Sequence, residues 1–199
     1  MPQLDSLRAI AMLGVMGPNS RALLSEVSGA DLSNAAHPFG QSREIEIGYA
    51  RLRASRITYV GELGWELYIP AEQVLDVYER LLEAGAKHGL THAGYHAMAA
   101  CRVEKGYRHW SHDIADEDTP LEAGLGFTVA WDKPGGFVGR DALLAQRQRG
   151  VLPKRLVQVM LDDDSATAPL LYHEEPIVRD GVIVGSTRSG AWGHRINRS

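Results

Sequence analysis

The chain has 199 residues, a formal net charge of -4 and a hydrophobic content of 44%, which is the composition of an ordinary globular protein with a hydrophobic core. The acidic balance excludes the basic footprint of a nucleic-acid-binding protein. A single cysteine, Cys101, excludes an intramolecular disulfide, and no apolar run approaches the roughly 20 residues that cross a bilayer.

The amino-terminal third predicts strands around one short helix. Residues 1–13 lack the positive region and long apolar run of a signal peptide, so we expect a cytoplasmic protein. The apolar run at 9–17 predicts a buried strand. Residues 18–29 begin with proline and end with glycine, as a short helix does.

An alternating pattern follows at residues 43–60. It predicts two antiparallel strands with a bend near Arg53 to Ser55, and residues 65–69 predict a third strand. Residues 70–89 then predict a helix and residues 93–106 a second one. One face of the first helix gathers its apolar and small side chains, namely Val74, Tyr78, Leu81, Leu82 and Gly85. Strands that return between helices indicate an α+β layer rather than a doubly wound sheet.

The carboxy-terminal third is less regular. The acidic, turn-prone segment at 113–120 is a candidate linker, and the residues after it predict a helical turn and a strand ending at Trp131. A helix is predicted at 139–150. From Lys154 onward, short apolar segments separated by turns predict the strands of a barrel or sandwich.

Histidines raise the question of a metal site. His88, His92 and His96 are spaced by four, but Gly89 and Gly94 interrupt any helix that could align them. His109 and His112 stand beside Asp113 without a third ligand at strict spacing. We therefore expect no metal site.

The stretch TYVGELGWELYIP at 58–70 places Glu62 in a loop of two glycines beside Trp65. A carboxylate accepts two parallel hydrogen bonds from an aminopyrimidinone edge such as that of a pterin, and tryptophan offers a stacking face. Glycines let backbone approach a ligand closely. A hairpin turn with a solvated glutamate explains the same residues, so the loop alone leaves both interpretations open.

A second informative stretch begins near the end of the predicted helix at 93–106. Arg102 is followed by Tyr107 and Trp110, and an arginine held by a helix can pair with Glu62 or with the glutamate tail of a folate. A charged helix end that packs on aromatic side chains is the alternative.

Four stretches together resemble the folate-binding aminomethyltransferase family, which includes the T-protein of the glycine cleavage system and the carboxy-terminal halves of sarcosine and dimethylglycine dehydrogenase. They are RITYVGELGWELYIP at 56–70, AGYHAMAACRVEKGYRHWSHDI at 93–114, DEDTPLEAGLGFTVAWDKPGGFVGRDALL at 116–144 and GSTRSGAWGH at 185–194. The amino-acid sequences of the second and third stretches are most similar to those of the dehydrogenase branch.

The resemblance implies a tetrahydrofolate site and the transfer of a one-carbon methylene unit from an amine to tetrahydrofolate. Glu62 matches the family glutamate that binds the pterin edge, and Arg102 matches an arginine that lines the same pocket. Trp65, Tyr107 and Trp110 are implied as wall residues.

The chain also departs from the family pattern. The family's catalytic aspartate lies upstream of a strand that corresponds here to AMLGVMGP at 11–18, so no catalytic residue can be assigned. The dehydrogenase branch needs a flavin domain, and the chain has no dinucleotide fingerprint. We expect a fragment truncated at both ends, which uses FAD only if a partner chain or a missing domain supplies its site.

The resulting expectation is an α+β fold. Residues 1–136 form a partial folate-binding domain with a mixed antiparallel sheet and helices, and residues 137–199 form a small incomplete all-β barrel domain. The chain either binds tetrahydrofolate, or serves as a non-catalytic subunit or fragment beside a flavoprotein partner, or is an inactive relic of the fold. We also expect low stability or self-association.

Overall fold

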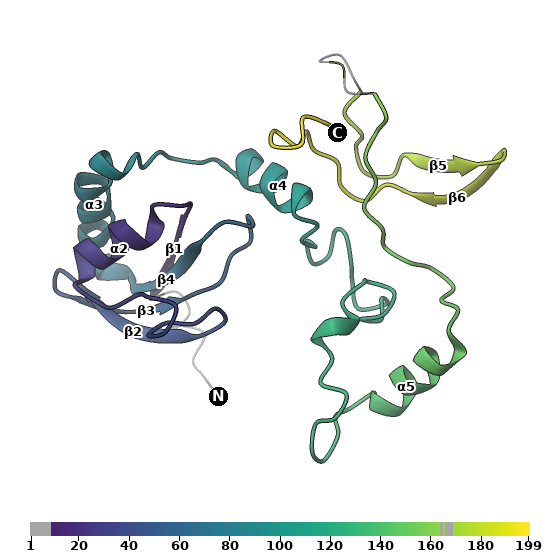
Figure 1. Cartoon of the computed structure of the whole chain (residues 1–199), viewed down its shortest axis with the longest axis horizontal. Coiled ribbons are helices and arrows are strands. Elements are labelled where there is room, and N and C mark those ends of the chain that lie inside the picture. Colours follow the sequence, from purple (N-terminus) through teal and green to yellow (C-terminus); the bar gives the residue numbers. More distant parts are fainter. Residues whose placement is uncertain (1–8, 164, 166–168) are drawn as a thin grey trace. The chain divides into compact units, whose positions relative to one another are not determined.

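The computed structural model describes residues 9–163, 165 and 169–199 (Figure 1). The chain forms two compact units, Met1–Cys101 and Arg102–Ser199, which we call the first and the second unit. The units reflect packing within this chain, and the domain boundary expected between residues 136 and 137 stays a prediction.

The first unit is built on a four-stranded antiparallel sheet in the order β1-β4-β3-β2. Its strands are β1 (Ile10–Met16), β2 (Ser42–Ile47), β3 (Ala50–Ser55) and β4 (Gly64–Pro70). β4 pairs with β1 along its whole length and with β3 through Arg53, Ala54 and Ser55. The antiparallel sheet predicted from the alternating pattern is therefore confirmed.

Two helices pack with this sheet. α2 (Ser20–Ser28) ends at Gly29, whose positive φ of 64° forms the left-handed cap that glycine favours. α3 (Val74–Gly85) lies between two short 3₁₀ segments, Ala71–Gln73 and Ala86–His88. α2 contacts α3 as well as β2 and β4 (Figure 1).

The core of the first unit lies between these helices and the sheet. The fully buried face of β4 is formed by Trp65, Leu67 and Ile69, in the alternation of a strand with one buried face. α3 buries Val77, Leu81 and Gly85, so its buried face is turned slightly from the predicted one: Tyr78 and Leu82 are only half-buried.

The bend predicted near Arg53 to Ser55 is wrong. β3 runs unbroken to Ser55, and the chain reverses at Gly48 and Tyr49, between the paired residues Ile47 and Ala50. Gly48 has φ of 59°, and a two-residue hairpin loop needs such a left-handed residue. Gly48 therefore indicates the turn better than residues 53–55 do.

The second unit contains less regular structure. α4 (Tyr95–Glu104) crosses the border between the units, and η3 (Gly126–Thr128) is a short 3₁₀ turn. α5 (Arg140–Arg149) is the predicted helix at 139–150, flanked by two glycines with positive φ. β5 (Pro176–Arg179) and β6 (Val182–Ser186) form a two-stranded antiparallel sheet.

Two of the predicted carboxy-terminal strands are not formed. Residues 124–131 contain the 3₁₀ turn instead of a strand, and residues 154–161 are not assigned to any strand. Leu156 and Leu161 each donate a single backbone hydrogen bond, to Glu122 and to Ser199, in place of a ladder. An apolar pattern becomes a strand only where a neighbouring strand pairs with it.

No helix among the described residues is long and apolar enough to cross a membrane.

Candidate functional site

The Glu62 loop joins β3 to β4 in the first unit. The carbonyl oxygen of Leu63 accepts hydrogen bonds from the backbone N–H of Gly17, at 2.7 Å, and from the hydroxyl of Ser20, at 3.0 Å. The turn between β1 and α2 therefore holds the residue next to Glu62. Glu62 itself is half-buried.

Local backbone structure explains why glycine stands at both positions of this loop. Gly61 has φ of 75°, a left-handed conformation that residues with a side chain rarely adopt. A Cβ on Gly64 would lie 2.1 Å from the sulfur of Met16 and 2.7 Å from the carbonyl oxygen of Val15. Gly64 thus allows β1 to pair closely with β4, and its place in the sequence does not require a ligand.

Trp65 lies in the core of the first unit. Its side chain is fully buried, and its indole N–H donates to Nδ1 of His37 at 3.3 Å. The guanidinium carbons of Arg21 and Arg56 lie 5.9 and 5.7 Å from its ring centroid. Trp65 supports the base of the Glu62 loop, and its part as a wall residue of a ligand pocket stays a prediction.

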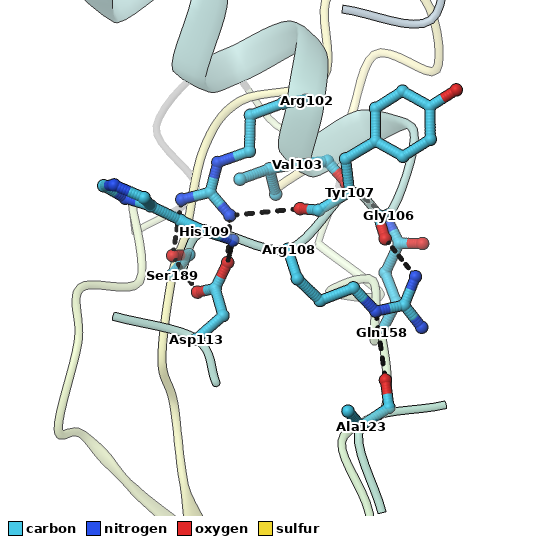
Figure 2. Close-up of polar contacts among 10 residues, drawn as sticks. All are labelled: Arg102, Val103, Gly106, Tyr107, Arg108, His109, Asp113, Ala123, Gln158 and Ser189. Atoms are coloured by element: carbon cyan, nitrogen blue, oxygen red, sulfur yellow. Dashed lines mark hydrogen bonds and ion pairs between the residues drawn. The ribbon is translucent and has the colours of Figure 1, made fainter. Parts of the chain in front are cut away.

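Arg102 lies in the last turn of α4 and belongs to a buried polar cluster of the second unit (Figure 2). Only 6% of Arg102 and 8% of Asp113 is exposed. The Arg102 guanidinium donates to the Asp113 carboxylate, to the hydroxyl of Ser189 at 2.7 Å and to the carbonyl of Tyr107 at 3.3 Å.

Asp113 is the other centre of this cluster. Its carboxylate accepts hydrogen bonds from the Ser189 hydroxyl and from the backbone N–H of His109, at 2.8 Å (Figure 2). In the sequence, Asp113 stands close to His109 and His112, and nothing there pairs it with Arg102. Because this residue is eleven positions from Arg102 and no helix continues that far, only the fold brings the two charges together.

The aromatic residues predicted near Arg102 have different surroundings. Tyr107 offers its carbonyl to Arg102, while its ring points away from the guanidinium (Figure 2). Trp110 is 61% exposed and forms an isolated bridge with Ile114. The second unit therefore brings Arg102 and the backbone of Tyr107 together, whereas Glu62 and Trp65 belong to the first unit.

Histidines do approach one another in the second unit. The ring centroids of His109 and His112 lie 5.7 Å apart, and those of His112 and His173 lie 5.5 Å apart. Across the part of the chain that the structure describes, no group of three or more His, Cys, Asp or Glu side chains could hold a metal ion.

A shallow hollow of about 380 Å³ lies at the start of α5, lined mainly by Gly135, Gly136, Phe137 and Arg140. It contains none of the predicted site residues. The Glu62 loop and the Arg102 cluster are therefore candidate sites because of their side-chain chemistry, and not because they line a cavity.

Two family models match the chain. The GCVT N-terminal domain matches residues 3–133, and the glycine cleavage T-protein C-terminal barrel domain matches residues 154–199. The first match includes Glu62 and Arg102, and the second includes Ser189. The expected α+β fold with an incomplete barrel is confirmed, since the two-stranded sheet of the barrel region does not close.

Similar proteins come from several lineages. The mitochondrial sarcosine dehydrogenase of Homo sapiens is 43% identical over 98% of this chain and 21% of its own length. The formaldehyde-forming 4-methylaminobutanoate oxidase of Paenarthrobacter nicotinovorans is 44% identical over 98% of this chain and 23% of its own. An aminomethyltransferase of Halothermothrix orenii is 37% identical over 91% of this chain and 48% of its own length.

The chain thus spans about a fifth of the length of the first two relatives. The N-terminal family model nevertheless covers more than half of the chain, in the region that carries the sheet, the Glu62 loop and Arg102. The chain belongs to the glycine cleavage T-protein (GCVT) family of aminomethyltransferase domains.

Proposed function

We propose that the chain binds tetrahydrofolate through Glu62 and acts as the folate-binding part of an aminomethyltransferase. The one-carbon unit would come from an amine derived from glycine, sarcosine or dimethylglycine. The observation that carries the proposal is the anchored Glu62 loop, which lies in the region of the GCVT N-terminal match.

The loop suits a pterin edge for two reasons. A half-buried carboxylate can accept parallel hydrogen bonds from the ring N–H and the exocyclic amine, and charge-assisted bonds of this kind are strong. The bonds from Gly17 and Ser20 to Leu63 hold the neighbouring backbone in place, so less ordering is needed when a ligand binds.

Tetrahydrofolate supplies the nitrogen that accepts the one-carbon unit. The part of this chain is to bind the pterin, orient it and exclude water, and orientation alone can lower a reaction barrier substantially. We propose Glu62 as the pterin ligand, and Trp65, Arg102, Tyr107 and Trp110 as further folate-binding residues. No residue is assigned a catalytic role.

A second function has its own support. The human sarcosine dehydrogenase contains a region 43% identical to this chain, which makes up 21% of that enzyme. The chain could therefore work as a non-catalytic part of a sarcosine- or dimethylglycine-oxidising enzyme, in which a flavoprotein partner provides FAD. Co-purification with a flavoprotein from the native host would favour this function, and its absence together with folate binding would favour the first.

We further propose a cytoplasmic location, because a single cysteine fits a reducing compartment. Fractionation of the host cell with an antibody to the chain tests this.

The decisive experiment is calorimetric titration of the purified chain with reduced folate. Glu62→Ala should weaken binding about tenfold or more, because a charge-assisted hydrogen bond contributes about 1.5–3 kcal/mol. Glu72→Ala is the matched control, since Glu72 is an exposed glutamate of the same unit. If neither wild type nor control binds although both are folded, the chain keeps the fold without the folate site.

A further inference from the structure

Two arginines of the first unit meet beside Trp65, and one of them lies at the start of the Glu62 loop. Arg21 comes from α2 and Arg56 follows the end of β3. Their guanidinium carbons lie 5.9 and 5.7 Å from the Trp65 ring centroid. Arg21 donates to the side-chain oxygen of Asn34 at 2.7 Å, and Arg56 donates to the carbonyl of His37 at 2.8 Å.

Within the described part of the chain, the hydrogen-bond acceptors of the two guanidiniums are neutral. Among the described residues, no ion pair joins Arg21 or Arg56 to a carboxylate. The Nε atoms of both arginines are buried and have no hydrogen-bond partner there. A cation–π contact with Trp65 stabilises a guanidinium but does not neutralise its charge.

The two guanidiniums also repel each other. Burial lowers the pKa of Arg56, and the positive charge of Arg21 lowers it further. Arg43 on β2 adds a third positive charge nearby by donating to the carbonyl of Ala36, although its charge is partly balanced by Asp31. In a chain of net charge -4, this local excess of positive charge is unusual.

We propose that Arg21 and Arg56 form a binding site for a small oxyanion, a phosphate or a carboxylate, beside Trp65. A planar guanidinium matches the oxygens of both groups, and an anion shared by two guanidiniums would remove their mutual repulsion. The site uses Arg21 and Arg56 rather than Glu62, and it stands whether or not the chain binds folate.

The test uses the full chain and two probes, inorganic phosphate and a γ-linked triglutamate. Calorimetry gives the affinity, and the NMR signals of the arginine Nε–H groups report contact directly. Phosphate should bind in the millimolar range, and Arg21→Gln and Arg56→Gln should each weaken binding about tenfold or more. Arg56→Lys, which keeps the charge but loses the planar donor set, should give an intermediate loss.

Arg53→Gln is the matched control, because Arg53 lies exposed on β3 and its loss changes net charge equally. It should change the affinity by less than about twofold. An equal loss in Arg53→Gln would mean that diffuse charge alone attracts the anion, and that result would overturn the proposal. So would unchanged Nε–H signals at phosphate concentrations that saturate a millimolar site.

The two probes also separate the sources of the anion. Tighter binding of triglutamate than of phosphate, lost in the same variants, identifies a carboxylate-bearing ligand, and the reverse order identifies a phosphate. If Arg56→Gln fails to fold, Arg21→Gln decides, since its partner Asn34 is exposed. Failure of the folate proposal and failure of this one can be told apart, because phosphate binding is measured without folate and is tested at Arg21 and Arg56.

Discussion

At the scale of single residues, Arg102 shows how a buried charge is compensated. Its guanidinium meets a carboxylate, a hydroxyl and a carbonyl, and the carboxylate of Asp113 accepts hydrogen bonds from two further donors, Ser189 and the backbone of His109. Such a pair is weak evidence for net stability, but removing one partner leaves an uncompensated buried charge. Ser189 bonds both partners and brings the region of the barrel match to this cluster.

We predict that Asp113→Asn destabilises the second unit by about 3–5 kcal/mol, because Arg102 would lose its anionic partner in a buried site. Ser189→Ala should cost only about 1 kcal/mol, the usual value of a hydrogen bond. Urea unfolding monitored by circular dichroism measures both. Asp116→Asn, at an exposed position, is the control. Equal effects of Asp113→Asn and Asp116→Asn would show that the cluster does not hold the unit together.

At the scale of elements, the pairing of β1 with β4 positions the Glu62 loop. The seven-residue register from Ile10↔Pro70 to Met16↔Gly64 ends directly beneath the loop. The hydrogen bonds from Gly17 and Ser20 to Leu63 continue that contact into α2. The position of Glu62 therefore depends on how closely two strands approach at Gly64.

We predict that Gly64→Ala lowers the free energy of unfolding by about 1–3 kcal/mol, as overpacking of a tight site does. The new Cβ would collide with Met16 and the backbone of Val15. The variant should also weaken binding of reduced folate, because the neighbouring loop must shift. Thermal unfolding and calorimetry measure the two effects.

Gly94→Ala provides the comparison, since a Cβ at Gly94 meets no atom within 4 Å. It should leave both stability and folate binding close to those of wild type. Normal stability in Gly64→Ala would show that β1 can move away from β4 at little cost.

At the scale of the whole molecule, apolar burial is unevenly distributed. In the described part of the chain, the fourteen buried hydrophobic residues of the core cluster all lie in the first unit, whereas the second unit adds only Ala123. The second unit depends on polar contacts, among them the Arg102 cluster and the ion pair between Lys154 and Asp118. Several apolar side chains of β5 and β6 are exposed.

We predict that hydrogen exchange is slowest in the strands of the first unit and faster throughout residues 124–163 and 169–199, because opening a segment with few buried apolar contacts costs little free energy. Mass spectrometry of exchanged peptides measures this. The low stability or self-association expected from the sequence would come from the same region. Uniform protection, or a monodisperse monomer with one cooperative transition at high temperature, would contradict both expectations.

Local patterns predicted much of the first unit. The positions of β1, α2, β4 and α3 follow from apolar periodicity and from glycine and proline at the ends of elements, which act over a few residues. The same patterns failed at residues 154–161, where apolar residues predict a strand but no neighbouring strand among the described residues pairs with them. Strand formation needs a partner, and the sequence does not show whether one is available.

By itself, the sequence determined the α+β class, the family and the glutamate loop, because each is carried by contiguous residues. Only the tertiary structure decided what surrounds them. It paired Arg102 with Asp113 and Ser189, buried Trp65 against His37, and placed two arginines from separate elements beside that indole. These contacts join residues up to 87 positions apart. Their partners are set by the packing of whole elements, which local periodicity does not encode.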